Sequence, residues 1–123
     1  MEKEEFGFKK LIVWQKAVEF ANKISLLIEA LDTNRKHYRL IEQLESASCS
    51  ISQNIAEGKG RYSNKEFIHF LYISRGSLYE TITILNIFFK NKWINKNQLD
   101  ELENEGIEIA RMIKGLINSL YES

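Results

Sequence analysis

The feature of this sequence that most limits its fold is the complete lack of proline in 123 residues. Proline interrupts helices because its ring removes a backbone N–H donor and clashes with the preceding turn. Glycine, the other residue that commonly marks turns and loops, occurs only six times. A chain with so few interruptions is typical of long helices joined by short connections.

Composition and charge exclude several classes of protein. Seventeen basic side chains balance seventeen acidic ones, and 44% of the residues are hydrophobic, which is ordinary for a soluble globular domain. No stretch approaches the roughly 20 apolar residues of a membrane-spanning helix, and residues 1–5 do not resemble a signal peptide. The one cysteine, Cys49, excludes an internal disulfide and is expected to be a buried small residue. We therefore expect a cytoplasmic protein whose residues 1–123 form one domain, with no membrane association.

Apolar residues recur at intervals of three and four in four segments, as they do along one face of an α-helix. The segments cover residues 11–31, 37–57, 64–91 and 96–121, with approximate ends. Connections this short place consecutive helices antiparallel. The pattern predicts an all-α fold, an antiparallel up-down-up-down four-helix bundle.

Two of the segments open with a capping signal. Ser63 is followed three residues later by Glu66, and Asn95 by Gln98. In a capping box each of the two side chains bonds to the backbone N–H of the other residue. Both pairs therefore predict the first turn of a helix.

Small residues predict how the second and third segments end and pack. Gly58 and Gly60 stand where a helix that ends in a left-handed residue would place them. Residues 47–50 (Ala-Ser-Cys-Ser) and 76–77 (Gly-Ser) lie inside the second and third segments. Because a glycine inside a helix costs about 1 kcal/mol relative to alanine, we expect the two helices to approach closely at these positions.

The third segment carries more apolar residues than one core-facing stripe needs. A helix that is apolar nearly all round is normally buried all round, and large exposed apolar patches mark interaction surfaces. We therefore expect self-association, with scattered surface hydrophobes as the alternative. The residues expected to form this oligomer interface are Ile68, Tyr72, Ile73, Tyr79, Ile84 and Ile87.

No arrangement of residues predicts catalysis. His37 and His69 stand alone, without a partner at metal-ligand spacing, and the Glu-x-x-His pairs of di-metal bundles do not occur. Residues 58–61 are glycine-rich but join two predicted helices, so they do not match a phosphate-binding loop that follows a strand. We expect no catalytic residue, no metal and no cofactor, so the chain is not expected to be an enzyme.

Charge is distributed unevenly along the chain. Residues 33–95 hold nine basic and five acidic side chains, a net of +4, although the whole chain is neutral. Lysine and arginine can neutralise phosphates while a tyrosine stacks on a base. The alternative interpretation is that these charged residues form a solvated rim of loops and bind no nucleic acid. The candidate nucleic-acid-binding residues are Arg35, Lys36, Arg39, Lys59, Arg61, Tyr62 and Lys65.

Four collinear motifs resemble a known family. They are Leu-Ile-Val-Trp-Gln-Lys-Ala at 11–17, Asn-Ile-Ala-Glu-Gly at 54–58, Gly-Arg-Tyr-Ser-Asn-Lys-Glu-Phe at 60–67 and Gly-Ser-Leu-Tyr-Glu at 76–80. Together they resemble the bacterial 23S rRNA intervening-sequence proteins, four-helix bundles encoded within insertions in large-subunit ribosomal RNA genes or elsewhere in the chromosome.

The resemblance implies a cytoplasmic, non-catalytic bundle that assembles as a homopentameric ring. A related branch, the accessory proteins of diversity-generating retroelements, uses a basic pentamer to engage nucleic acid and a reverse transcriptase. Polar residues of the family could bind a ligand or RNA, or could be structural, with four of them forming a network that fixes the turn near residue 60. By matching position they fall on Asn54, Glu57, Arg61, Ser63, Glu66 and Glu80.

The first functional hypothesis is thus a homo-oligomeric bundle that binds RNA or a ribonucleoprotein. The alternatives are a scaffold that binds a protein partner without nucleic acid, or a retroelement accessory protein.

Overall fold

The structure is a computed structural model that describes residues 4–31 and 37–123. These residues form four α-helices, one short 3-10 helix and no strand, which confirms the all-helical prediction. The helix boundaries lie within two residues of the expected ranges, and only the 3-10 helix was not predicted. The elements are η1 (Gly7–Lys10), α1 (Ile12–Glu29), α2 (Tyr38–Lys59), α3 (Asn64–Lys90) and α4 (Lys96–Glu122).

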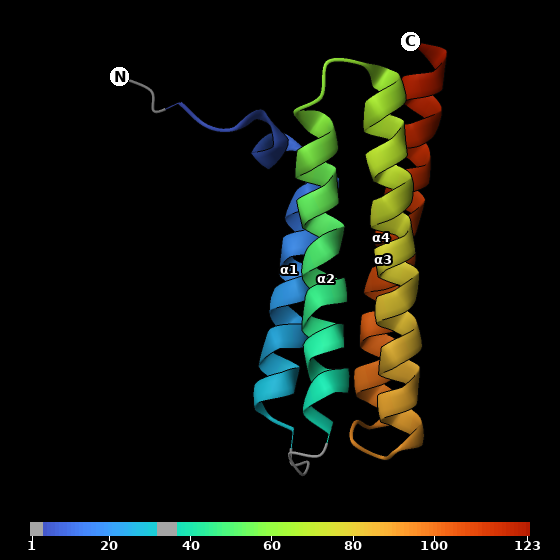
Figure 1. Ribbon diagram of the computed structural model, residues 1–123. Helices are drawn as coiled ribbons and strands as arrows, with labels where there is room; N and C mark the ends of the chain where they lie inside the picture. The colour runs from blue at the N-terminus through green and yellow to red at the C-terminus, as the bar shows by residue number, and fades with distance from the viewer. Residues whose placement is uncertain (1–3, 32–36) are drawn as a thin grey trace.

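The four helices lie side by side, and each packs against two neighbours (Figure 1). In this view α1 runs downward, α2 upward, α3 downward and α4 upward. The connection between α2 and α3 therefore lies at the upper end, near the C-terminus, and the connection between α3 and α4 lies at the lower end. In the described part of the chain, none of the helices has the length and hydropathy needed to cross a membrane.

One apolar core runs between the helices. Its completely buried side chains include Phe20 from α1, Ile51 from α2, Leu78 from α3 and Ile113 from α4. Burial of an aliphatic or aromatic side chain of this size contributes about 1.5–3 kcal/mol relative to leaving it in water. The core is therefore the main source of stability. The joints between helices contribute less to it, so they can hold polar and charged residues.

Two of the residues expected in the oligomer interface belong to this core instead. Ile68 is 7% exposed and Ile84 is 3% exposed, so the prediction that they lie on the surface is wrong. The reason is that α3 packs against both α2 and α4, which covers a wider part of its circumference than one stripe.

The close approach of α2 and α3 occurs through serines. The Ser77 hydroxyl donates to the Ser50 hydroxyl at 2.9 Å, and the buried Ser74 hydroxyl donates to the Ile51 carbonyl at 2.8 Å. Gly76 and Cys49 take no part in this contact, although each directly precedes one of the two bonded serines, Ser77 and Ser50, in the sequence. Cys49 is exposed and Gly76 faces open space, so both predictions of close packing at these residues are wrong.

Gly58 has a role that the sequence pattern did not predict. No glycine among the described residues has a positive φ, so the expected left-handed helix end is wrong. A Cβ at Gly58 would instead lie 2.8 Å from Cβ of Phe70 and 2.9 Å from Cδ1 of Phe67. The glycine is needed because the first turns of α3 press against the end of α2.

The two predicted capping signals differ in how completely they form. Asn95 and Gln98 make the reciprocal capping box, with bonds of 2.9 and 2.8 Å. The Ser63 hydroxyl accepts from the Glu66 backbone N–H at 3.2 Å, but the Glu66 carboxylate lies 3.4 Å from that same hydroxyl rather than on the backbone. Ser63 is therefore a single cap, and Asn95 a full box.

The end of α3 places a lysine where a glycine would be relaxed. Lys92 has φ of 65°, and it is the one non-glycine residue with positive φ in the described ranges. Its N–H donates to the Phe89 carbonyl, and the Trp93 N–H donates to the Phe88 carbonyl, both at 2.9 Å. The Phe88 and Trp93 rings are 5.0 Å apart. These contacts form a Schellman motif, whose left-handed position usually holds glycine.

Replacing Gly58 by alanine is expected to destabilise the protein by about 1–3 kcal/mol, because the new methyl group overlaps two phenylalanines. The matched control is Gly76→Ala, which has open space and should raise stability by about 0.5–1 kcal/mol through its helix propensity. Urea denaturation followed by circular dichroism measures both. Equal effects of the two substitutions would contradict the packing role of Gly58.

Replacing Lys92 by glycine is expected to stabilise the protein by about 1 kcal/mol, because it relieves the left-handed strain of a residue with a Cβ. The same denaturation experiment measures the change. Lys90→Gly, inside the last turn of α3, is the control and should be destabilising by a similar amount. A loss of stability in Lys92→Gly would show that the lysine side chain contributes to folding.

Candidate nucleic-acid interface

The predicted basic residues fall at the two ends of the bundle. Lys59, Arg61 and Lys65 surround the turn between α2 and α3, which we call the α2–α3 joint (residues 59–65). Arg39 is exposed in the first turn of α2, about 30 Å away by helical rise. Within one chain these groups do not form a single surface. Arg35 and Lys36 lie outside the described residues.

The α2–α3 joint exposes one aromatic ring completely. Tyr62 has a relative exposure of 106%, so water surrounds its whole side chain. Lys59 and Lys65 on either side are exposed and make no ion pair with any other described residue. The joint therefore presents a ring and two unpaired cations to solvent.

Arg61 is bound differently from the two lysines. Its Nη2 lies 2.6 Å from Oε1 of Glu57, and its guanidinium carbon lies 4.8 Å from the centre of the Phe70 ring. A hollow of about 400 Å³ beside it is lined by both Glu57 and Glu66. Two carboxylates repel a phosphate, so Lys59 and Lys65, which do not line this hollow, are the better place for one.

The residues of the family's polar motif form separate local contacts. Asn54 donates to the Ser50 carbonyl and hydroxyl, both at 2.8 Å, and thus joins the serine contact between α2 and α3. Glu80 accepts from Gln43 at 3.2 Å, about 24 Å along α3 from its start. The expected network of Asn54, Glu57, Arg61 and Glu80 at the turn is therefore wrong. Only the Glu57–Arg61 pair lies there, beside the Ser63–Glu66 cap.

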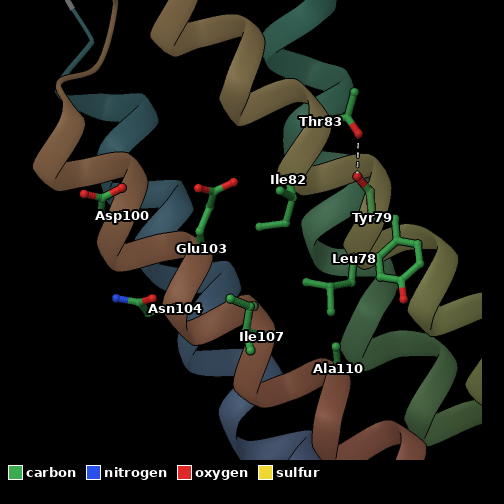
Figure 2. A pocket seen from close by; sticks show the side chains of 10 residues that line it. Leu78, Tyr79, Ile82, Thr83, Asp100, Glu103, Asn104, Ile107 and Ala110 are labelled. Atoms are coloured by element: carbon green, nitrogen blue, oxygen red, sulfur yellow. Dashed lines mark hydrogen bonds between the residues drawn. The ribbon is translucent and has the colours of Figure 1, made fainter.

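A groove runs between α3 and α4, with a volume of about 670 Å³ (Figure 2). Leu78 and Ile82 of α3 point into it toward Ile107 of α4, and Tyr79 lies over its rim. Gly106 makes its floor, where a Cβ would lie 3.0 Å from Cδ1 of Ile82. We call it the α3–α4 groove; Asp100 and Glu103 line its other end.

Helix α3 carries several exposed apolar side chains, of which Tyr79 lines the α3–α4 groove. Of the predicted interface residues, Tyr72, Ile73, Tyr79 and Ile87 are exposed by 40–56%. The guanidinium of Arg75 lies 4.9 and 5.8 Å from the rings of Tyr72 and Tyr79. The neighbouring hydroxyl of Tyr72 on α3 raises the pKa of Tyr121 on α4 above its usual value.

Sequence reasoning missed the α4 side of this surface. Ile107 and Tyr121 are 49% and 65% exposed. They are fourteen residues apart, which is close to four helical turns and places them on one face. That spacing is a signal that could have found them.

Sequence reasoning also missed a group of lysines at the turn between α3 and α4, which we call the α3–α4 joint (residues 90–96). Lys90, Lys92 and Lys96 belong to it, and no Asp or Glu occurs between Glu80 and Asp100. The ring of His37, just before α2, lies 4.4 Å from that of Trp93. The start of α2, with Arg39, therefore lies at the same end of the bundle as these lysines.

The described residues contain no group of three or more His, Cys, Asp or Glu side chains placed to hold a metal ion. His37 packs on Trp93, and the ring of His69 lies 5.7 Å from that of Phe70.

Comparison with known proteins places the chain in a family. The model of the 23S rRNA-intervening sequence proteins matches residues 9–115. A similar solved structure is that of a protein of unknown function from the S23 ribosomal protein family of Bacteroides thetaiotaomicron VPI-5482. It is 27% identical, with a TM-score of 0.79, over 86% of this chain and 98% of the other. No protein of curated function matches the chain. The chain therefore belongs to the family of 23S rRNA-intervening sequence proteins, as its four motifs predict.

Proposed function

We propose that this chain is a non-catalytic helical bundle that assembles with copies of itself into a five-subunit ring and binds RNA. The observation that carries the RNA-binding part is the α2–α3 joint, where the completely exposed Tyr62 stands between two lysines that make no ion pair with any described residue. Membership in a family associated with ribosomal RNA genes favours RNA over other polyanions. The number of subunits comes from the family resemblance.

Electrostatics explains how a neutral chain could bind RNA. The net charge is zero, so long-range attraction is weak and binding depends on local cations. Lys59 and Lys65 have no carboxylate partner among the described residues, so a phosphate can replace water around them without breaking an ion pair. An exposed tyrosine adds a stacking surface that accepts any base. In a ring each such joint repeats once per subunit, and the contacts add.

The apolar surface of α3 and α4 supports self-assembly. Tyr72, Tyr79, Ile107 and Tyr121 are 41–65% exposed and belong to the two helices that border the α3–α4 groove. Exposed apolar residues concentrated on two neighbouring helices are typical of interaction surfaces. If this surface binds a different protein instead, the chain is a scaffold, and the experiments below separate the two functions.

Binding of a fluorescently labelled single-stranded fragment of large-subunit rRNA is expected to weaken with salt, by about 0.7 in log affinity per neutralised phosphate for each tenfold rise in salt. Replacing Lys59 and Lys65 by glutamine should flatten this slope, whereas Lys114→Gln, an exposed lysine in the middle of α4, should not. Fluorescence anisotropy across a salt series measures the slope. No binding by the wild-type protein at low salt would favour the scaffold.

Replacing Tyr79 and Ile107 by aspartate is expected to convert the oligomer into monomers, because two charges would be buried in the proposed interface. Light scattering after size-exclusion chromatography measures the mass. Leu26→Asp, on the exposed part of α1, is the matched control and should leave the oligomer intact. Ile84 is unsuitable for this test because it is buried in the core. A monomeric wild-type protein would contradict the assembly.

A further inference from the structure

A second hollow, of about 700 Å³, lies at the α3–α4 joint. This joint and the α2–α3 joint stand at opposite ends of the bundle (Figure 1). Three of its seven lining residues are apolar and four are polar. We call it the lysine hollow. Its lining residues are Phe89, Lys90, Lys92, Trp93, Ile94, Asn95 and Gln98.

Among the described residues, the charged side chains that line the lysine hollow are all positive. Lys90 and Lys92 line it and make no ion pair with any described residue, and no carboxylate is part of its wall. Lys96 nearby is already engaged, with its Nζ 2.9 Å from Oδ1 of Asp100, which raises the pKa of Lys96. The hollow at the α2–α3 joint and the α3–α4 groove each contain two carboxylates, so neither offers an anion the same environment.

Two amide side chains add hydrogen-bond donors to this wall. In the capping box the Asn95 Oδ1 and the Gln98 Oε1 each accept a backbone N–H. The oxygens are therefore committed to the start of α4, and the NH₂ groups remain as donors. The polar side of the hollow thus combines two ammonium groups with two amide donors, which suits the several oxygens of a phosphate group.

The apolar side of the hollow points to a ligand with more than a phosphate. Phe89, Trp93 and Ile94 form it, and Trp93 is held in place by Phe88 at 5.0 Å and His37 at 4.4 Å between ring centres. A bare phosphate would leave these rings against water, whereas a base or sugar would cover them. The volume lies in the range of about 300–1,000 Å³ that is usual for small-ligand sites, and a mononucleotide is of that size.

The backbone conformation at this joint is also unusual. Lys92 occupies the left-handed position of the helix end, where glycine would be relaxed. Residues in sparsely populated backbone conformations cluster at functional sites, and Lys92 lines the hollow.

We propose that the lysine hollow binds a nucleotide unit, with Lys90 and Lys92 on its phosphate and the Phe89–Trp93 wall against its base or sugar. The unit is either a free mononucleotide or part of a single RNA strand. The inference deepens the proposed RNA binding and rests on that function only for the RNA form of the ligand.

Trp93 provides a direct measurement, because Trp14→Phe leaves it as the one tryptophan of the chain. In that background, the Trp93 fluorescence is recorded against uridine monophosphate, inorganic phosphate and a ten-nucleotide oligouridylate. Uridine monophosphate should change the fluorescence saturably and bind at least about tenfold more tightly than phosphate. Lys90→Gln with Lys92→Gln should weaken it by about tenfold or more, as expected for loss of charge-assisted bonds. Lys114→Gln should bind normally.

Lys92→Gly separates binding from folding. It should be more stable than the wild type and yet bind uridine monophosphate more weakly, which a merely structural lysine would not do. The proposal is overturned if the double glutamine variant binds like the wild type, if no fluorescence change occurs with the mononucleotide, or if phosphate and mononucleotide bind equally well.

The oligouridylate distinguishes this inference from the proposed function. Suppose that oligouridylate binding is lost in Lys59→Gln with Lys65→Gln but not in the Lys90 and Lys92 variant, and that uridine monophosphate leaves the Trp93 fluorescence unchanged. This result would overturn the proposal for the hollow and leave RNA binding intact. If the wild type binds the mononucleotide but neither the oligouridylate nor rRNA fragments, the hollow stands as a free-nucleotide site and the proposed function fails.

Discussion

The contact between α2 and α3 is the one on which the rest of the molecule depends. Two serine hydroxyl bonds and a glycine pressed against two phenylalanine side chains allow these helices to approach closely. Close packing gains dispersion energy and leaves the buried serines satisfied. Helix α3 runs from the α2–α3 joint to the α3–α4 joint. The contact that holds α3 against α2 therefore also determines where both joints lie.

Ion pairing determines which charges remain available. On the α1–α4 side, Lys16 lies 3.2 Å from Glu108, and Lys23 bonds to both Glu101 and Glu105, which raises the pKa of Lys23. Such exposed pairs contribute little stability, but they neutralise the lysines of α1 with the acidic residues of α4. Among the described residues, Lys59 and Lys65 at one joint and Lys90 and Lys92 at the other have no such partner. A neutral chain therefore has two ends with local positive charge and a flank, formed by α1 and α4, on which acidic side chains outnumber basic ones.

The sequence was sufficient for the elements and for part of the candidate interface. The three- and four-residue spacing predicted four helices, and the Asn95–Gln98 signal predicted a full capping box, because both depend on local geometry alone. The basic residues of the α2–α3 joint were also recognisable as a local cluster. Ile68 and Ile84 were misplaced, because the width of the covered face of α3 depends on how many helices pack against it. Ile107 was missed because its exposure beside Tyr79 depends on how α3 and α4 are aligned.

What the sequence by itself determined, then, is where helices begin and end and which chemistry each joint carries, since backbone hydrogen bonds, caps and charge are set by neighbouring residues. Only the tertiary structure decided that Gly58 serves a contact rather than a turn, and that Lys90 and Lys92 border one hollow with Trp93. It also decided that Arg61 is paired while Lys59 and Lys65 make no ion pair with any described residue. The first property depends on a distance between residues of different helices, and the others depend on side-chain distances that sequence spacing alone does not fix. Such distances follow from packing, which a one-dimensional pattern does not contain.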